Sequence, residues 1–382
     1  MPELARTGVI GVAIRPAVTQ ANRSLEELLY DVTQDALRDA GLAIDDIDGI
    51  VVAGNDQYDG RAISVMMASG AVGGVDRDIL STPSAGEHAF VMGALRIASG
   101  QFRTQLVVAW SPTEASSIAE AQRLAADPYF HRRLPLDEVA THAMQANALL
   151  AVMPEAAALA GTIAAKNREN GARAYPALPR DAGAAPTPWP LRPGMLAAPV
   201  TGAVALVLAS PDFIAERSGT PAAWVAGMGW ATEPSFLGDR ALTEAPALRE
   251  AARQAYAAAN IAAPARQFDL AEVADTTPFQ ELLAYEALGL AARADWSARV
   301  ADGSFARGGA LPVNLSGGAQ AFNPVFCTGL ARIAEVANQM RGRAGPHQRA
   351  GAHSGLAHAA SGFAMQYNTV VVLRRDAEEK RA

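Results

Sequence analysis

The chain has 382 residues and is 50% hydrophobic, which is ample for a large buried core and suggests two domains or one large one. Its net charge of −7 comes with scattered Lys and Arg residues, and without a basic stripe we expect no nucleic-acid partner. No apolar run reaches the length of a membrane span, and the N-terminus lacks a signal-peptide pattern, so a cytoplasmic protein is expected. The single cysteine, Cys327, excludes an intrachain disulfide and is expected to be a buried packing residue.

The first part of the chain alternates apolar strands with an amphipathic helix. Residues 9–14 and 47–53 are apolar, strand-like runs. Between them, Ser24 and Glu27 have the spacing of a capping box, and apolar residues then recur on one helical face as far as Gly41, a typical helix stop. Strand, helix and strand in this order indicate a βαβ unit.

A small-residue helix and a looser segment follow. Residues 82–100 predict a turn that opens a buried helix, and residues 106–110 predict the next buried strand. The pattern loosens over about residues 111–200, apart from a helix predicted at 158–174. We expect this stretch to be an insertion or cap, with His131 in an exposed loop.

The second half of the chain repeats the order of the first. Strand 202–209 closes the first half, and the expected elements of the second are strands at 223–228, 268–273 and 369–373 and helices at 246–259 and 279–290. We therefore predict an α/β protein of two related βαβ-rich halves. They span residues 1–215, which include the cap, and residues 216–382.

One stretch, residues 313–340, combines a short apolar run, a glycine loop and a helical pattern. The loop holds Ser316, Gly317 and Gly318, and the helix follows Pro324. A strand, a glycine loop and a helix in succession are typical of sites where backbone N–H groups and a helix N-terminus meet a ligand.

The amino-acid sequence of this stretch resembles that of the thiolase superfamily. Asn314, Gly317 and Gly318 match its Asn-x-x-Gly-Gly loop, and residues 328–331 match the Thr-Gly-Leu-Ala that follows its Gly-His-Pro signature. Segments along nearly the whole chain are similar to the family in the same order. The similarity points to the sterol-carrier-protein-x-like or lipid-transfer-protein branch. It implies a doubled α/β fold with sheets packed around buried helices, a homodimer, coenzyme A thioesters as substrates and no bound cofactor.

The residues of thiolase chemistry are missing. Thiolysis needs a cysteine thiolate at a helix N-terminus, a second acid or base, a histidine and oxyanion donors. The family's nucleophile position falls on Pro83, with Ser84 beside it, and the histidine of the signature is replaced by Asn323. Asp275 is what remains of the motif ahead of the helix at 279–290. The second cysteine is also absent from residues 358–361.

Some lipid-transfer-type members with this pattern are implied to be retro-aldolases that act on coenzyme A thioesters of steroid side chains. A base removes the 3-hydroxyl proton, and an oxyanion hole holds the thioester enolate. The polar candidates for catalysis are Tyr367, His358, Asp275 and Asn323. The candidates for a substrate or oxyanion loop are Gly317, Gly318 and Gly362. His358, Ser361 and Tyr367 are expected in one loop that faces the Gly317–Gly318 loop. The resemblance also implies a small zinc-ribbon and OB-fold partner, a DUF35 protein, and no metal in this chain.

Two alternatives stay open at the level of sequence. Ser84, activated by His88 four residues later on the same helix face, would support acyl transfer by a non-standard mechanism. A non-catalytic thiolase-like subunit that binds acyl-CoA would also lack the thiolase residues.

Overall fold

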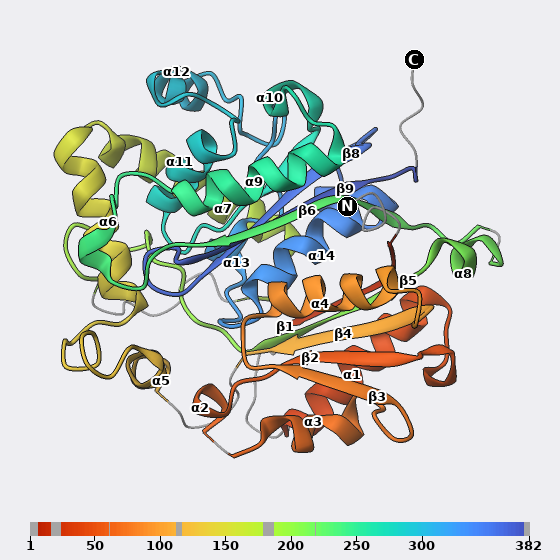
Figure 1. The fold of residues 1–382 in the computed structure, drawn as a ribbon. Helices are drawn as coiled ribbons and strands as arrows, with labels where there is room; N and C mark the ends of the chain where they lie inside the picture. The colour runs from red at the N-terminus through yellow and green to blue at the C-terminus, as the bar shows by residue number, and fades with distance from the viewer. Residues whose placement is uncertain are drawn as a thin grey trace.

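A computed structural model describes residues 7–16, 24–60, 62–111, 117–178, 187–217 and 219–377. These residues form one nine-stranded sheet that consists of two parts (Figure 1). Helices lie between the two parts and also cover the outer face of each part. The strands are β1 (Gly8–Pro16), β2 (Gly49–Ala53), β3 (Asp78–Thr82), β4 (Thr104–Trp110), β5 (Gly202–Ala209), β6 (Ala223–Thr232), β7 (Leu270–Glu272), β8 (Ser354–Ser361) and β9 (Tyr367–Arg374). Their order across the sheet is β3-β2-β4-β5-β1-β6-β9-β8-β7.

The helices follow the predicted order with additions in the cap. Those of the first half are α1 (Leu25–Ala40), α2 (Asp56–Asp59), α3 (Ser64–Ala71), α4 (Gly86–Ala98), α5 (Ile118–Ala125), α6 (Glu138–Val152), α7 (Ala156–Ala174) and α8 (Pro211–Ala215). Those of the second half are α9 (Pro246–Ala259), α10 (Pro264–Gln267), α11 (Pro278–Ala287), α12 (Trp296–Ala301), α13 (Gly318–Ala321) and α14 (Thr328–Arg341).

The sheet consists of two parts with matching strand directions. In the first, β2 is parallel to β4, and β4, β5 and β1 run antiparallel to one another in turn. In the second, β7 is parallel to β8, and β8, β9 and β6 follow the same antiparallel sequence. The parts are joined where β1 pairs with β6 through Gly8–Trp224 and Val9–Ala223. The α/β fold with sheet layers around buried helices is therefore confirmed, with the two layers continuous at one edge.

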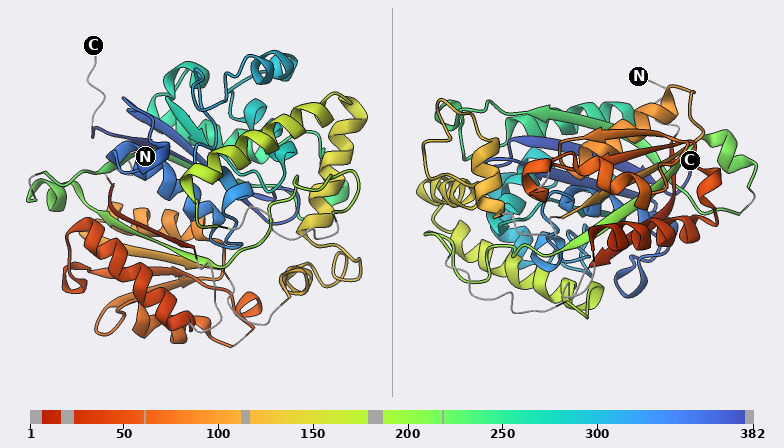
Figure 2. Two further views of the ribbon diagram at one scale, coloured as in Figure 1. Left: turned by 180° about the vertical axis from the view of Figure 1, so that it is seen from behind. Right: turned by 90° about the horizontal axis from the view of Figure 1, so that it is seen from below.

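The layers explain which helices are buried. α4 and α14 lie between the two parts of the sheet, α1 covers the outer face of the first part and α9 that of the second (Figure 1). α14 is buried around most of its circumference, so its apolar side chains pack on both parts. Burial of one leucine of this kind, such as Leu330, contributes about 1.5–3 kcal/mol. Views from behind and below show α5 and α6 at one end of these layers (Figure 2).

Local sequence rules account for the termini of α1. Ser24 accepts a hydrogen bond from the Glu27 backbone while the Glu27 side chain accepts one from Ser24, which is the predicted capping box. Gly41 ends the helix in a left-handed conformation, as predicted. α4 differs from the prediction, because its N-cap is Ala85 and Ser84 lies in the turn before it.

Two other expectations were wrong. His131 is 4% exposed rather than in an exposed loop, because its ring packs against Phe236 and Phe363. His358, Ser361 and Tyr367 do not share one loop, because His358 and Ser361 lie in β8, and Tyr367 begins the paired strand β9. β8 has small residues at most positions and was not predicted as a strand.

Candidate functional site

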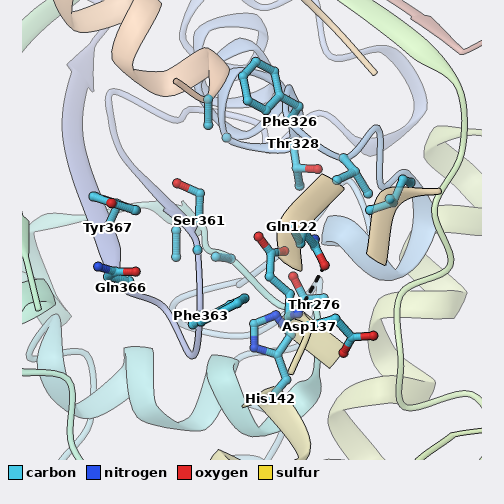
Figure 3. Close-up of a pocket in the computed structure, with 18 of the residues that line it drawn as sticks. Gln122, Asp137, His142, Thr276, Phe326, Thr328, Ser361, Phe363, Gln366 and Tyr367 are labelled. Atoms are coloured by element: carbon cyan, nitrogen blue, oxygen red, sulfur yellow. Dashed lines mark hydrogen bonds between the residues drawn. The ribbon is translucent and has the colours of Figure 1, made fainter. Parts of the chain in front are cut away.

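A cavity of about 490 Å³ opens where the two halves meet the cap (Figure 3). Its wall combines the turn before α4, the first turn of α14, the end of β8 with the following turn, and the cap helices α5 and α6. Of the predicted site residues, those that line it are Ser84, Asn323, Gly362 and Tyr367. Asp275, His358, His88, Gly317 and Gly318 are not among its lining residues.

Both central helices begin at this cavity. Ala85 and Glu87 line it at the start of α4, and Thr328 and Gly329 line it at the start of α14. The first N–H groups of a helix lack intrahelical acceptors and carry partial positive charge. The two helix starts therefore favour negative charge in the cavity, such as that of an enolate oxygen.

Glycine allows the two helix starts to lie close together. A Cβ atom on Gly86 would lie 2.9 Å from the Cβ atoms of Ala109 and Leu330. A Cβ atom on Gly329 would lie 2.3 Å from Oε2 of Glu87. The Gly86 N–H also donates to the Phe326 carbonyl at 2.8 Å, which ties the start of α4 to the segment before α14.

Ser84 and His88 form a direct contact. The Ser84 Oγ lies 2.5 Å from Nδ1 of His88, and the His88 ring meets the Tyr367 ring edge to face with centroids 6.1 Å apart. Tyr367 is 39% exposed and lines the cavity. The side chains of Ser84 and Tyr367 thus share one region of the cavity wall.

Glu87 and Ser361 connect α4 to β8 in the cavity wall. Glu87 is 1% exposed, and its Oε1 accepts a hydrogen bond from the Ser361 hydroxyl at 2.9 Å. Both residues line the cavity, so a buried carboxylate lies beside the turn that contains Gly362.

Asn323 occupies the cavity wall with its side chain held in place. Its Oδ1 accepts from the Thr328 hydroxyl at 2.9 Å, and its Nδ2 donates to the Ala197 carbonyl at 3.1 Å. An amide NH2 group has two N–H donors, so one remains for a ligand in the cavity. Asn323 cannot act as a base, but it fits the role of an oxygen-binding donor.

The structure places Asp275 behind the cavity. Ala274 and Thr276 line the cavity, whereas Asp275 is fully buried and accepts hydrogen bonds from the Ala319 N–H at 2.5 Å and the Asn167 amide at 2.8 Å. Burial and, to a smaller extent, the nearby Glu281 raise the pKa of Asp275 to about 7. Asp275 therefore connects buried segments and does not face the cavity.

The Gly317–Gly318 loop also packs inward. The Gly317 N–H donates to the Asn314 carbonyl and the Gly318 N–H to the Ser316 hydroxyl. A Cβ atom on Gly318 would lie 2.3 Å from Asp275, so the close approach of this buried carboxylate requires glycine. The N–H groups expected to bind an oxyanion are already used inside the protein.

His358 is fully buried in β8 rather than exposed to the site. Its Nε2 lies 3.2 Å from the Asn368 Oδ1, across the hairpin formed by β8 and β9. Burial lowers the pKa of His358 to about 4, so the ring is neutral at physiological pH. Its position indicates a packing role.

Cys327 is fully buried, with its Sγ 4.0 Å from the Gly202 carbonyl. Burial raises its pKa well above the ordinary value, and the nearby Glu87 raises it further. A thiol in this environment is protonated and unreactive at physiological pH, which agrees with its predicted packing role.

The polar side chains from the cap were missed by sequence reasoning. Glu138 and His142 lie one turn apart on α6 and both line the cavity, as does Gln122 of α5. Burial, together with the nearby carboxylates of Asp137 and Glu87, raises the pKa of Glu138 to about 7, although a hydrogen bond from the Gly362 N–H lowers it. The spacing of Glu138 and His142 was the available signal, since residues four apart share a helix face.

A buried ion pair supports the floor of the cavity. The Arg332 Nη1 donates to the Glu272 carboxylate at 2.9 Å and to the Ser316 hydroxyl at 2.7 Å, and all three side chains are buried. Burial raises the pKa of Glu272 although the Arg332 guanidinium lowers it. The pair fixes α14 to β7 and to the glycine loop.

No helix in the described ranges is long and apolar enough to cross a membrane. No group of three or more His, Cys, Asp or Glu side chains there is arranged to hold a metal ion.

Comparison with known proteins agrees with this architecture. A family model described as Thiolase C-terminal domain-like matches residues 231–375. The chain is 36% identical over 159 residues to an acetyl-CoA acetyltransferase of Methanothermobacter thermautotrophicus, which is 41% of this chain and 41% of that protein. It is 33% identical over 163 residues to sterol carrier protein 2 of Oryctolagus cuniculus, which is 41% of this chain and 29% of that protein.

Among solved structures, the Ltp2-ChsH2(DUF35) aldolase matches with a TM-score of 0.79 and 19% identity, over 99% of this chain and 100% of that chain. At this identity the match establishes the fold alone, and the matched region spans less than half the length of the two relatives. The layered sheets and paired helix starts at one cavity define a thiolase-fold protein. Residues 231–375 match the Thiolase C-terminal domain-like family, and the chain resembles the thiolase superfamily and its sterol-carrier-protein-x-like branch, as the sequence motifs predicted.

Proposed function

We propose that the chain is a carbon–carbon lyase that cleaves a bulky, steroid-like 3-hydroxyacyl-CoA by a retro-aldol reaction. The observation that carries the proposal is the cavity itself. The starts of α4 and α14 meet at a cavity with a largely apolar wall, and the single cysteine, Cys327, is buried outside that wall. Pro83, at the position that the resemblance assigns to the nucleophile, lines the cavity. The match to the fold of the Ltp2-ChsH2(DUF35) aldolase supports this choice of reaction.

The size and lining of the cavity suit a bulky acyl group. Its volume of about 490 Å³ lies within the range of roughly 300–1,000 Å³ typical of ligand pockets. Apolar side chains contribute much of the wall, among them Ile118, Leu196, Val325 and Phe326. A ring-bearing acyl group would bury its surface against these residues while the coenzyme A portion extends toward solvent.

The reaction needs two proton transfers and one oxygen-binding site. The proton leaves the 3-hydroxyl, the bond between C2 and C3 breaks, and its electron pair becomes the thioester enolate. A ketone leaves, and a proton is added to C2 to give the shortened acyl-CoA. Asn323 and the starts of α4 and α14 would hold the enolate oxygen, and Tyr367 would deliver the proton to C2.

Partners form part of the proposal. The solved aldolase named above includes a DUF35 protein, and we propose a small partner of that type for this chain as well. A homodimer remains a prediction from the resemblance, and a cytoplasmic location remains a prediction from the sequence pattern.

The test is turnover by the chain purified with and without a small protein of the DUF35 type. The substrate is a tertiary 3-hydroxyacyl-CoA, hydroxycyclohexyl-acetyl-CoA, and the expected products are cyclohexanone and acetyl-CoA, detected by mass spectrometry. Tyr367→Phe is expected to lower kcat by about 10²–10⁴-fold. Tyr30→Phe is the matched control, because Tyr30 lies on α1 outside the cavity and is 55% exposed. Binding of the substrate without product, with the partner present, would favour a non-catalytic subunit.

A second candidate function, acyl transfer, is favoured by the 2.5 Å contact between Ser84 and His88. Here the Ser84 Oγ would attack the thioester carbon, His88 would take its proton, and coenzyme A would leave. The relative named an acetyl-CoA acetyltransferase is in accord with such a role. A mass increase of Ser84 by an acyl group during turnover, lost in Ser84→Ala, would support acyl transfer over the lyase.

A further inference from the structure

Two side chains of α6 face the cavity from the cap and have no counterpart in the predicted site. Glu138 and His142 both line the cavity and lie one helical turn apart. In Figure 3, His142 and Asp137 lie on the side of the cavity away from Phe326 and Thr328. The cap thus brings an acid and an imidazole to the wall across from the start of α14.

Hydrogen bonds determine which nitrogen of His142 carries the proton. The Gln280 Oε1 accepts from the Thr277 N–H at 3.4 Å, so the other end of this amide, Nε2, faces His142. This NH2 group donates to Nδ1 of His142 at 3.0 Å. Nδ1 is therefore an acceptor, and in the neutral ring the proton lies on Nε2.

The surroundings keep His142 neutral. Burial and, to a smaller extent, the positive charge of Arg240 lower its pKa to about 4. At physiological pH the ring therefore offers an N–H donor and carries no charge. A neutral imidazole that donates to a substrate oxygen is a known device for polarising a carbonyl group.

Glu138 is held at the start of α6 with its carboxylate in the cavity. Its backbone N–H donates to Gln122 at 3.1 Å, and the Asp137 side chain caps the helix by accepting from the Ala140 N–H at 2.7 Å. The carboxylate accepts from the Gly362 N–H and faces the carboxylates of Asp137 and Glu87. Gly362 in turn packs against the Tyr367 ring, so Glu138 and Tyr367 flank the same turn.

We propose that Glu138 and His142 act directly on the 3-hydroxyl of the substrate, an assignment that rests on the proposed lyase function. The Glu138 carboxylate takes the hydroxyl proton while the Nε2–H of His142 donates a hydrogen bond to the same oxygen. The C2–C3 electron pair then passes to the thioester enolate, the oxygen becomes the ketone oxygen, and Tyr367 protonates C2. Tyr367 then takes a proton from solvent, and Glu138 releases its proton to solvent, so no further reactant is needed.

The raised pKa of Glu138 supports this role, because a base works best when its pKa lies near the operating pH. The groups that face it are Asp137 and Glu87 by charge and Gly362 by its N–H. Asp127 and His131 line the same cavity. Below about pH 7, protonation of Glu138 would remove the base and lower kcat.

The experiment compares variants on hydroxycyclohexyl-acetyl-CoA with the partner present, from about pH 5 to about pH 9, a range that brackets the proposed base. Glu138→Gln is expected to lower kcat by about 10²–10⁴-fold with little change in KM and to remove the acidic limb of the pH profile. Glu138→Asp keeps a carboxylate and should keep that limb at a reduced rate. Glu155→Gln is the control, because Glu155 is exposed and lies outside the cavity.

Two variants of His142 test whether its N–H donor is needed for turnover. His142→Phe is expected to lower kcat by about 10²–10³-fold, and His142→Gln, which restores an N–H donor, should recover part of the rate. Melting temperatures of all variants show whether each is folded. Wild-type turnover with an unchanged pH profile in Glu138→Gln would overturn the assignment while leaving the lyase intact. Absence of product from the wild-type chain with its partner would overturn the lyase function and this assignment with it.

Discussion

Replacing Arg332 with methionine tests how the floor of the cavity is stabilised. Arg332 and Glu272 are at most 1% exposed and 2.9 Å apart, so solvent does not screen the pair. Removing one partner of a buried ion pair costs about 3–5 kcal/mol, because the other charge stays buried alone. For 382 residues at about 2.1 cal/mol/K each, this corresponds to a decrease in Tm of about 4–6 °C.

The sign of the pH dependence follows from Glu272. Burial raises its pKa in the folded protein, and loss of the Arg332 charge would raise it further. Because the folded pKa is the higher one, protonated Glu272 contributes its full stability at pH values below the unfolded pKa. That contribution is lost as the pH rises through the folded pKa. The deficit of Arg332→Met should therefore shrink as the pH falls.

The assay measures Tm by calorimetry at acidic and neutral pH. The internal control is a double variant that carries both Arg332→Met and Glu272→Gln. Glutamine still accepts from the Ser316 N–H, which donates to Glu272 at 2.9 Å in the wild-type chain. The double variant should therefore recover most of the lost Tm at neutral pH. A single variant within about 1 °C of wild type would refute the reasoning, since an unpaired buried carboxylate would then cost almost nothing.

The remaining predictions concern the site and the helices beneath it. If the chain is a lyase, Ser84→Ala should keep kcat within about threefold of wild type, whereas a loss comparable to that of Tyr367→Phe would favour Ser84 as a nucleophile. Gly329→Val should lower stability by about 1–3 kcal/mol in denaturant unfolding, because its side chain would meet Glu87 and Ala359, and an unchanged midpoint would contradict this contact. The pKa of Glu138 is raised to about 7, so wild type should lose Tm relative to Glu138→Gln as the pH rises from about 5 to about 8, and parallel Tm curves would argue against the raised pKa.

Much of the fold follows from local sequence rules. The capping box of Ser24 and Glu27, the stop at Gly41 and the apolar strands β2, β4 and β5 each depend on residues close in sequence, and each was predicted. β8 was missed because its small residues have little intrinsic strand preference. Its pairing with β9 and β7 and its burial against α14 determine that conformation, and these contacts are distant in sequence.

The residues that line the cavity could be predicted only in part, for a related reason. Asn323, Gly362 and Tyr367 line the cavity, but motif matching could not separate them from Asp275, whose chain neighbours line the cavity while its own side chain turns inward. Glu138 belongs to a segment that the sequence indicated only as a cap. Its role at the cavity depends on how α6 docks against the turn after β8, which no local pattern encodes.

The position of β9 has a consequence for how the protein is made. The cavity wall draws on residues from Tyr58 to Tyr367, and β9 pairs with both β6 and β8. A ribosome adds about 5–20 residues per second, so the strands of the first half are complete well before β9 emerges. Until then, the apolar surface of α14 lacks part of its cover, which is a hazard for aggregation. A chain cut before β9 is therefore expected to be a substrate for chaperones and proteases rather than a folded protein with an incomplete cavity.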